Sequence, residues 1–528
     1  MTPLAPALAA AALVLGVCAL ALAGLGGAAG ALDLGLISDP YVQRALRFTL
    51  LQASLSTALS LALGALLALA LARRRFPLRG AVIASLGALF VLPSIVAILG
   101  LVTLYGRSGL INTGLHKAGI TATLAIYGLP GILLAHVFFN APLAARIFLT
   151  ALEAVPQAHW RLARALGFAP LHIFKIIDWP ALRKSGIGAA SLIFILCATS
   201  FAIVLALGGG PQAATLEVAI YESLRFDFNL PRAATLAFLQ IAMILIFFLA
   251  IEAIAPRARE AQAQGGAAER GDTRSGATRA LDAVAFALAA LVIAGPVLGA
   301  VISAAPGKFA DIFSDPAFYR ALLGSLAIAL PAGLLAAALA TAIAYGVAHL
   351  QITKRQPKAA RALSASASAL LIAPPFALAA GLFIALRPLA DPASLAMPLV
   401  ALVNALTALP IALRIIGPPA LANAERHGRL AASLGVSGLP RLRLIEAPLL
   451  RAPLGLALAT VIAFSIGDLG VAALFGMGDT MTLPLYVYSL VGSYRMDQGG
   501  AAALLLCGLI LLLFAGIERI ARGRMRYD

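Results

Sequence analysis

The chain alternates between long apolar runs and short polar segments, and the spacing of the runs is the first guide to its fold. Roughly twenty consecutive apolar residues are needed to cross the hydrocarbon core of a bilayer as an α-helix. Runs of that length recur in two sets of six, near residues 6–28, 46–72, 81–104, 122–145, 185–207 and 233–255, and near 281–303, 320–349, 363–386, 395–413, 454–476 and 499–517. The pattern predicts an all-α polytopic protein of the lipid bilayer with about 12 transmembrane helices.

The polar segments divide the chain and orient it. Residues 256–280 are rich in Ala, Gly, Gln and charge, and they predict a flexible cytoplasmic linker between a first half, residues 1–255, and a second half, residues 281–528. Basic segments at 73–79, 354–361 and 518–526 all fall on one side of the membrane. By the positive-inside rule that side is the cytoplasm, so we expect both termini there.

Composition narrows the class of protein further. The chain is 62% hydrophobic and only 12% charged, which is far more apolar than a soluble fold requires. A net charge of +17 could indicate a nucleic-acid partner, but the basic residues lie in connecting loops and no nucleic-acid-binding motif is present, so we expect none. The three cysteines and six histidines are dispersed, without the spacing of a disulfide or metal site.

One polar segment occurs twice. Residues 161–183 read RLARALGFAPLHIFKIIDWPALR, and residues 429–451 read RLAASLGVSGLPRLRLIEAPLLR. The same register matches Pro142 with Pro410 upstream and, after one gap, Tyr221 with Tyr488 downstream. Because an even number of spans separates the copies, the halves are expected to be parallel six-helix repeats that present two equivalent cytoplasmic surfaces. Such a pair of surfaces suits a two-fold symmetric partner.

Each copy predicts a short helix, a turn and a second short segment that leads into a membrane helix. A glycine is expected to end the first helix in a left-handed backbone, an acid to N-cap the membrane helix, and a proline to occupy its first turn. These residues are Gly167, Asp178 and Pro180 in the first copy and Gly435, Glu446 and Pro448 in the second. One such segment could be an ordinary amphipathic connection, whereas two copies with the same spacing favour a docking function.

The repeated G-x9-I-x2-P spacing resembles the cytoplasmic coupling loop, or EAA loop, of the permease subunits of ATP-binding-cassette importers. Arginine replaces the glutamate of that motif here, and only its second alanine is kept. The resemblance implies that the loop residues contact two copies of an ATPase subunit, with Ala163/Gly167 and Ala431/Gly435 in its clefts. The positions concerned, besides those named above, are Arg161, Ala163, Ile177, Arg429, Ala431 and Ile445.

No G-x-x-x-x-G-K-[ST] phosphate loop is present, so ATP hydrolysis is expected on a separate chain. We therefore expect this protein to be no enzyme and to hold no cofactor of its own, with ATP and Mg²⁺ bound by the partner ATPase.

Three further stretches sharpen the resemblance. Residues 127–146, 205–224 and 465–476 resemble the corresponding parts of the fused twelve-helix permeases that import thiamine and thiamine pyrophosphate. The resemblance implies a permease of the bacterial inner membrane that receives its small-molecule substrate from a periplasmic binding protein. Ferric-iron importer permeases are the nearest alternative, and a secondary transporter is a more distant one because few acids lie within the spans.

Four residues are candidates for the translocation path. Asp468 is an ionisable group within an apolar run, which by default is a functional hypothesis. Ser200 occupies the matching position of the first half, and the two are expected to flank the path, with Asp468 favouring a cationic thiazolium. A packing role for Asp468 is an equal alternative. Tyr221 and Tyr488, on the outer side, could stack on an aromatic cation, although packing is the more common duty of such residues.

Overall fold

The computed structural model describes residues 4–29, 34–121, 123–254, 270–305, 307–371, 373–389, 394–436, 438–475 and 481–522, and its elements are all helical over these ranges. Eleven of the helical segments are long and apolar enough to cross a membrane, and shorter apolar helices accompany them. The expected all-α polytopic fold is confirmed. Most of the predicted linker, residues 256–280, lies outside the described residues; the description resumes at Arg270, and the next α-helix begins at Gly276.

The first half contains six long or membrane-depth helices joined by shorter ones. The longer helices are α1 (Leu4–Ala29), α2 (Pro40–Arg73), α4 (Ser94–Tyr105), α6 (Leu129–Glu153), α9 (Trp179–Ala198) and α12 (Leu230–Ile254). The shorter helices are α3 (Arg79–Ala88), α5 (Leu110–Lys117), α7 (Gln157–Ala165), α8 (Pro170–Ile173), α10 (Ala202–Leu207) and α11 (Leu216–Arg225), with η1 (Leu34–Ser38), η2 (Leu89–Val91), η3 (Phe174–Asp178) and η4 (Pro211–Ala213) between them.

The second half repeats this plan. Its longer helices are α13 (Gly276–Ala289), α14 (Gly295–Ile302), α16 (Pro316–Ala348), α18 (Pro375–Leu386), α19 (Ala396–Ser433), α21 (Ala447–Gly467) and α24 (Met496–Arg522). The shorter helices are α15 (Lys308–Phe313), α17 (Pro357–Ser368), α20 (Gly438–Arg441), α22 (Gly470–Phe475) and α23 (Leu483–Gly492), with η5 (Gly271–Arg274), η6 (Ala290–Ala294), η7 (His349–Thr353), η8 (Ala369–Leu371) and η9 (Leu442–Glu446).

Two predicted spans in each half are not continuous helices. The third span breaks at Pro93 in the first half and at Pro374 in the second, and both prolines have φ −58° and ψ 136°. Proline lacks the N–H that a helix interior needs and forces the preceding residue towards extended backbone, so the single spans expected at 81–104 and 363–386 are wrong. The fifth span also breaks in both halves, after Ala198 and after Gly467, here without a proline, before a short helix follows.

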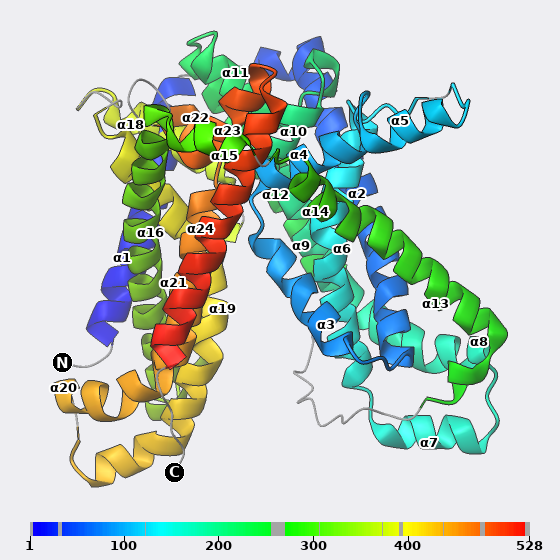
Figure 1. The fold of residues 1–528 in the computed structure, drawn as a ribbon. Helices are drawn as coiled ribbons and strands as arrows, with labels where there is room; N and C mark the ends of the chain where they lie inside the picture. The colour runs from blue at the N-terminus through cyan, green and yellow to red at the C-terminus, as the bar shows by residue number, and fades with distance from the viewer. Residues whose placement is uncertain are drawn as a thin grey trace.

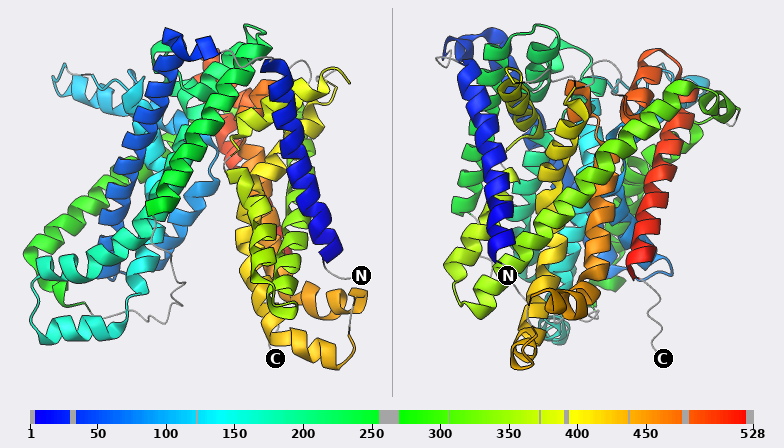
Figure 2. Two further views of the ribbon diagram at one scale, coloured as in Figure 1. Left: turned by 180° about the vertical axis from the view of Figure 1, so that it is seen from behind. Right: turned by 90° about the vertical axis from the view of Figure 1, so that its left-hand side faces the viewer.

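The first helix of each half packs against the other half. Helix α1 contacts α16 and α18, whereas α13 packs on α2 and α14 packs on α4. Figures 1 and 2 show the result: α1 lies beside the second-half helices, α13 lies beside the first-half helices, and the two groups of ribbons diverge towards the end that carries α7 and α20. The beginning of α1 and the end of α24 also lie at that end (Figure 1).

The contact between α4 and α14 depends on a missing side chain. A Cβ atom at Gly100 would lie 1.9 Å from the Pro296 carbonyl oxygen and 2.9 Å from the Ala300 nitrogen, both on α14. Small residues let membrane helices approach this closely. The two halves are therefore joined by backbone contact as well as by side chains.

We expect Gly100→Val to lower the free energy of unfolding by about 1–3 kcal/mol, because the added side chain must push α14 away from α4. The measurement is the thermal unfolding midpoint of the detergent-purified protein. Gly508→Val on α24 is the matched control, since nothing lies within 4 Å of a Cβ at Gly508. Equal midpoints for the two variants would contradict the close contact.

Candidate functional sites

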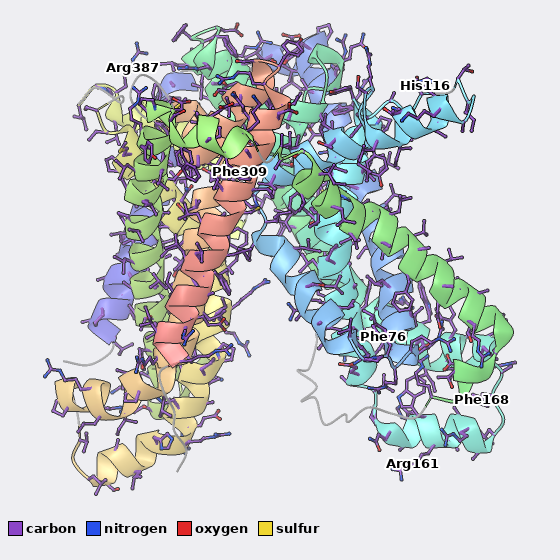
Figure 3. The ribbon with its side chains drawn as sticks, in the orientation of Figure 1. Phe76, His116, Arg161, Phe168, Phe309 and Arg387 are labelled. Carbon is purple, nitrogen blue, oxygen red and sulfur yellow. The ribbon has the colours of Figure 1, made fainter. Side chains whose placement is uncertain are left out.

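The duplicated segment forms two loops at the same end of the molecule, here called loop 1 (residues 157–180) and loop 2 (residues 425–448). Loop 1 consists of α7, α8 and η3 and leads into α9, whereas loop 2 consists of the end of α19, α20 and η9 and leads into α21. Pro156 separates α6 from α7, but Ala424 occupies the matching position of the second half and α19 runs on without a break. Helix α7 lies across the lower end of the first half in the view of Figure 3, and Arg161 points away from the body of the protein.

The glycines end their helices as predicted. Gly167 has φ +62° and Gly435 has φ +66°, which is the left-handed region that favours glycine. In each loop the N–H of the next residue donates back to the buried alanine, over 3.0 Å from Phe168 to Ala163 and over 2.9 Å from Val436 to Ala431. This arrangement satisfies the last carbonyl groups of the helix. The two loops therefore share one backbone geometry at their turns.

The alanines and isoleucines support the loops from within. Ala163 and Ala431 are 3% and 1% exposed, so their methyl groups are buried beneath the loop surface. Ile177 is buried with Trp160 and Ile173 in a small apolar cluster, and Ile445 is half-buried.

Sequence reasoning missed the apolar side chains that the loops do expose. Leucine or isoleucine is exposed by more than half at matching places in both loops: Leu162 and Leu430, Leu166 and Leu434, Ile176 and Leu444. Exposed apolar residues that recur in the same register mark an interaction surface. The signal that could have found them is the recurrence of these apolar residues at the same positions of both copies of an otherwise polar segment.

The acids do not cap the helices that follow. Asp178 and Glu446 have helical backbone angles and make no capping bond, because η3 and η9 are π-helical turns that continue directly into α9 and α21. The N-cap prediction is therefore wrong. Instead, Asp178 accepts two hydrogen bonds from Arg270, and Glu446 accepts one from Arg441. Pro180 and Pro448 lie in the first turns of α9 and α21, as predicted.

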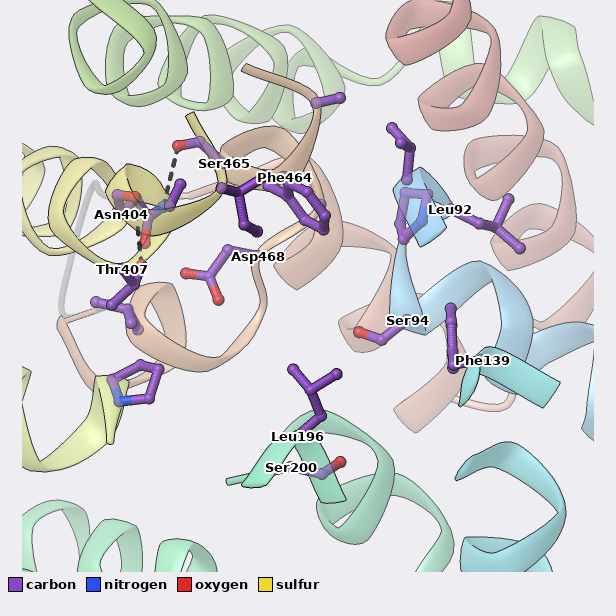
Figure 4. Close-up of a pocket in the computed structure, with 18 of the residues that line it drawn as sticks. Leu92, Ser94, Phe139, Leu196, Ser200, Asn404, Thr407, Phe464, Ser465 and Asp468 are labelled. Atoms are coloured by element: carbon purple, nitrogen blue, oxygen red, sulfur yellow. Dashed lines mark hydrogen bonds between the residues drawn. The ribbon is translucent and has the colours of Figure 1, made fainter. Parts of the chain in front are cut away.

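A cavity of about 380 Å³ lies between the two halves. Its walls come from the breaks in the third and fifth spans, including Pro93, Pro375 and Asp468, and from the middle of α6 and α19. Figure 4 shows the side chains of both halves around this space. The helix breaks that the hydropathy pattern did not reveal thus line the central cavity.

Ser200 and Asp468 both line this cavity, whereas Tyr221 and Tyr488 are not among its lining residues. The Oδ1 atom of Asp468 accepts the Gly470 N–H over 3.1 Å, and its buried Oδ2 atom has no hydrogen-bond partner. In Figure 4 the Asp468 carboxylate is directed into the space between Thr407, Leu196 and Ser94. One oxygen therefore accepts a hydrogen bond from the backbone, and the other is buried at the cavity wall without a hydrogen-bond partner. Tyr221 packs its ring against Phe201 and Phe376.

Further polar groups line the cavity that sequence reasoning did not assign to it. His136 has its Nδ1 atom 2.9 Å from the Ser56 hydroxyl, and its buried Nε2 atom has no hydrogen-bond partner. Asn404 occupies the matching position of the second half and donates to the Ser465 hydroxyl over 3.0 Å. The equivalence of two polar residues in the repeat is the signal that could have found them. Among the described residues, no group of three or more His, Cys, Asp or Glu could hold a metal ion.

Comparison with known proteins shows similarity to transport permeases over nearly the whole chain. Residues 60–260 match the family model of the binding-protein-dependent transport system inner membrane component. The chain is 40% identical to the thiamine transport system permease protein of Brucella melitensis over 496 residues, which cover 94% of this chain and 91% of the relative. The permease proteins of the same description from Escherichia coli and Haemophilus influenzae are 39% and 36% identical, over 93% and 90% of this chain and 91% and 88% of the relatives.

Proposed function

Because the chain belongs to the family of thiamine transport system permease proteins, we infer that it is the membrane-spanning subunit of an ATP-driven importer for thiamine. It is a transport subunit of the inner membrane, and the enzymatic step belongs to a separate ATPase. The relatives do not favour the ferric-iron or secondary-transporter alternatives.

The proposed docking of an ATPase rests on one observation: loops 1 and 2 have the same backbone geometry at their turns. Gly167 and Gly435 turn both loops in the same way, and matched apolar side chains are exposed beside them. An ATPase dimer, with ATP and Mg²⁺ bound between its subunits, would grip one loop with each copy. No nucleotide or other cofactor is then needed in this chain.

Orientation follows from the docking proposal. The loops, the start of α1 and the end of α24 share one end of the molecule, which would face the cytoplasm in an importer. The opposite end, where α11 and α23 lie, would receive the periplasmic binding protein. The excess of basic residues in the loops agrees with this orientation.

The cavity supports passage of a small molecule through the middle of the membrane. Its volume of about 380 Å³ falls within the range of small-ligand pockets. Asp468 would attract the cationic thiazolium ring, and Ser200 would lie on the opposite wall. Thiamine phosphates carry the same thiazolium cation, so attraction to Asp468 would act on free thiamine and on its phosphate esters alike.

The test of this function is uptake of radiolabelled thiamine by cells that lack their own thiamine importer. The chain is expressed together with an ATPase subunit and a thiamine-binding protein of the same importer family. We expect uptake that requires all three proteins and that excess unlabelled thiamine suppresses. Uptake that persists without the ATPase would overturn the proposal in favour of a secondary transporter.

A further inference from the structure

The segment that precedes α13 inserts a side chain into loop 1. The Arg270 guanidinium donates from Nη1 to Asp178 Oδ1 over 3.0 Å and from Nη2 to Asp178 Oδ2 over 2.7 Å. It also lies 4.3 Å from the centroid of the Trp160 ring. Asp178 ends η3 and Trp160 lies in α7, so Arg270 joins the two sides of loop 1.

The same contacts continue into α2 and α13. Arg73, at the end of α2, donates to Asp272 over 2.9 Å and to Asp282 of α13 over 3.1 Å. Arg74 donates to the second oxygen of Asp282 over 2.6 Å. We call these six residues the loop 1 ion-pair cluster: Arg73, Arg74, Asp178, Arg270, Asp272 and Asp282. It joins loop 1, the end of α2 and the start of α13.

The cluster is buried and its charges balance. Five of its six side chains are at most 4% exposed, and Arg74 is 23% exposed. Burial opposes ionisation of Asp272, but hydrogen bonds and positive charge from Arg270 and Arg73 prevail and hold its pKa below the ordinary value. Buried charges are tolerated only when each keeps its partners, and a two-point arginine–carboxylate contact also fixes orientation. The cluster therefore specifies one arrangement of the three elements.

Loop 2 has no equivalent among the described residues. Its acid, Glu446, pairs with Arg441 of the same loop over 2.8 Å, and the side chains of this pair are 14% and 32% exposed. Gly428 occupies the position that matches Trp160. Helix α1, which packs on the second half as α13 packs on the first, carries no charged residue over Leu4–Ala29. The two loops thus match in their turns and differ in how they are attached.

We propose that Arg270 makes the segment before α13 a structural part of loop 1, so that loop 1, α2 and α13 move as one body during transport, whereas loop 2 is attached mainly by packing. The inference rests on the proposed docking of an ATPase at both loops. Helix α13 leads through η6 into α14, which packs on α4, and α4 begins at Ser94 on the cavity wall. Movement of loop 1 would reach the cavity along this path. Arg270 is a positioning residue in this scheme.

The experiment compares variants of the full complex reconstituted in proteoliposomes. Asp178→Asn combined with Arg270→Gln removes the pair without leaving a buried charge alone, and Arg270→Lys keeps the charge but loses the two-point contact. Arg441→Gln is the control that breaks the ion pair within loop 2, where the freed Glu446 side chain is 14% exposed. One readout is the number of ATP molecules hydrolysed per thiamine imported. The other is the mobility of a nitroxide spin label at Arg161→Cys in loop 1 or Ser433→Cys in loop 2, in a chain whose three natural cysteines are replaced by alanine.

We expect the paired neutral variant to retain the ATPase, to raise the ATP-per-thiamine ratio at least threefold, and to increase label mobility at position 161 but not at 433. Arg270→Lys should raise the ATP-per-thiamine ratio and the label mobility at position 161 less than the paired variant does. Arg441→Gln should change the ATP-per-thiamine ratio less than twofold. Unchanged mobility at 161 in the paired variant, or an equal loss of coupling in Arg441→Gln, would overturn the proposal. The spin-label measurement needs no ATPase, so it tests the ion-pair cluster independently of docking. Failure of the wild-type chain to bind an ATPase would refute the docking function and leave this measurement valid.

Discussion

Changing Gly167 and Gly435 to aspartate together should release the ATPase from the purified complex and abolish thiamine uptake. Both glycines have left-handed backbone, which costs other L-residues about 1–2 kcal/mol each. The new carboxylates would also stand beside the exposed leucines that we assign to the docking surface. Together these effects should weaken ATPase binding by at least about 100-fold, since 1.4 kcal/mol is a factor of ten in affinity. The measurement is the amount of ATPase that co-purifies with the tagged permease.

The control for strain is asparagine at the same two positions. Asparagine has nearly the shape of aspartate and a similar tolerance of left-handed backbone, but it adds no charge. We expect the asparagine pair to keep most of the bound ATPase, and each single aspartate variant to give an intermediate loss. Full retention of the ATPase by the double aspartate variant would remove the basis for calling these segments coupling loops.

Asp468→Asn should reduce thiamine uptake by about 10–100-fold, which corresponds to the 1.5–3 kcal/mol of a hydrogen bond to a charged group. Asparagine keeps an oxygen for the Gly470 N–H and removes the negative charge that faces the cavity. The change therefore separates a role in holding α22 from a role in attracting a cation. The measurement is initial uptake rate in proteoliposomes, together with ATPase activity stimulated by the binding protein.

Ser200→Ala is the matched control on the opposite wall of the cavity. It removes a neutral hydroxyl, so we expect a change in uptake of about fivefold or less, on the scale of the roughly 1 kcal/mol of one neutral hydrogen bond. If Asp468→Asn imports thiamine at the wild-type rate with unchanged ATPase coupling, the aspartate serves the fold alone. A parallel fall in the thermal midpoint would indicate the same structural role.

Several features of this protein follow from the sequence because their causes are local. An apolar run long enough to cross the bilayer can be identified from the sequence wherever it occurs, and so can a duplicated segment. Gly167 and Gly435 could be assigned to left-handed turns because backbone sterics at one residue decide that conformation. The resemblance of the loops and of three longer stretches to importer permeases then led to the thiamine class.

Other features depend on residues far apart in the chain, and only the tertiary structure decided them. Asp178 is a plausible N-cap from its neighbours, but it pairs with Arg270, 92 residues away. Hydropathy gives the third spans as continuous because the apolar residues around Pro93 and Pro374 keep the average of the window high, yet each proline breaks its helix. The exchange of α1 and α13 between the halves was not predicted either.

The sequence by itself determined that the chain crosses the membrane many times and carries two matched loops, since burial of apolar surface and backbone sterics act residue by residue. The tertiary structure decided which helices meet, that broken helices of both halves enclose a cavity beside Asp468, and that, among the described residues, buried charges join loop 1 rather than loop 2 to the segment before α13. The physical reason is that ion pairs and cavities are properties of side chains brought together by packing, and no local pattern records their partners.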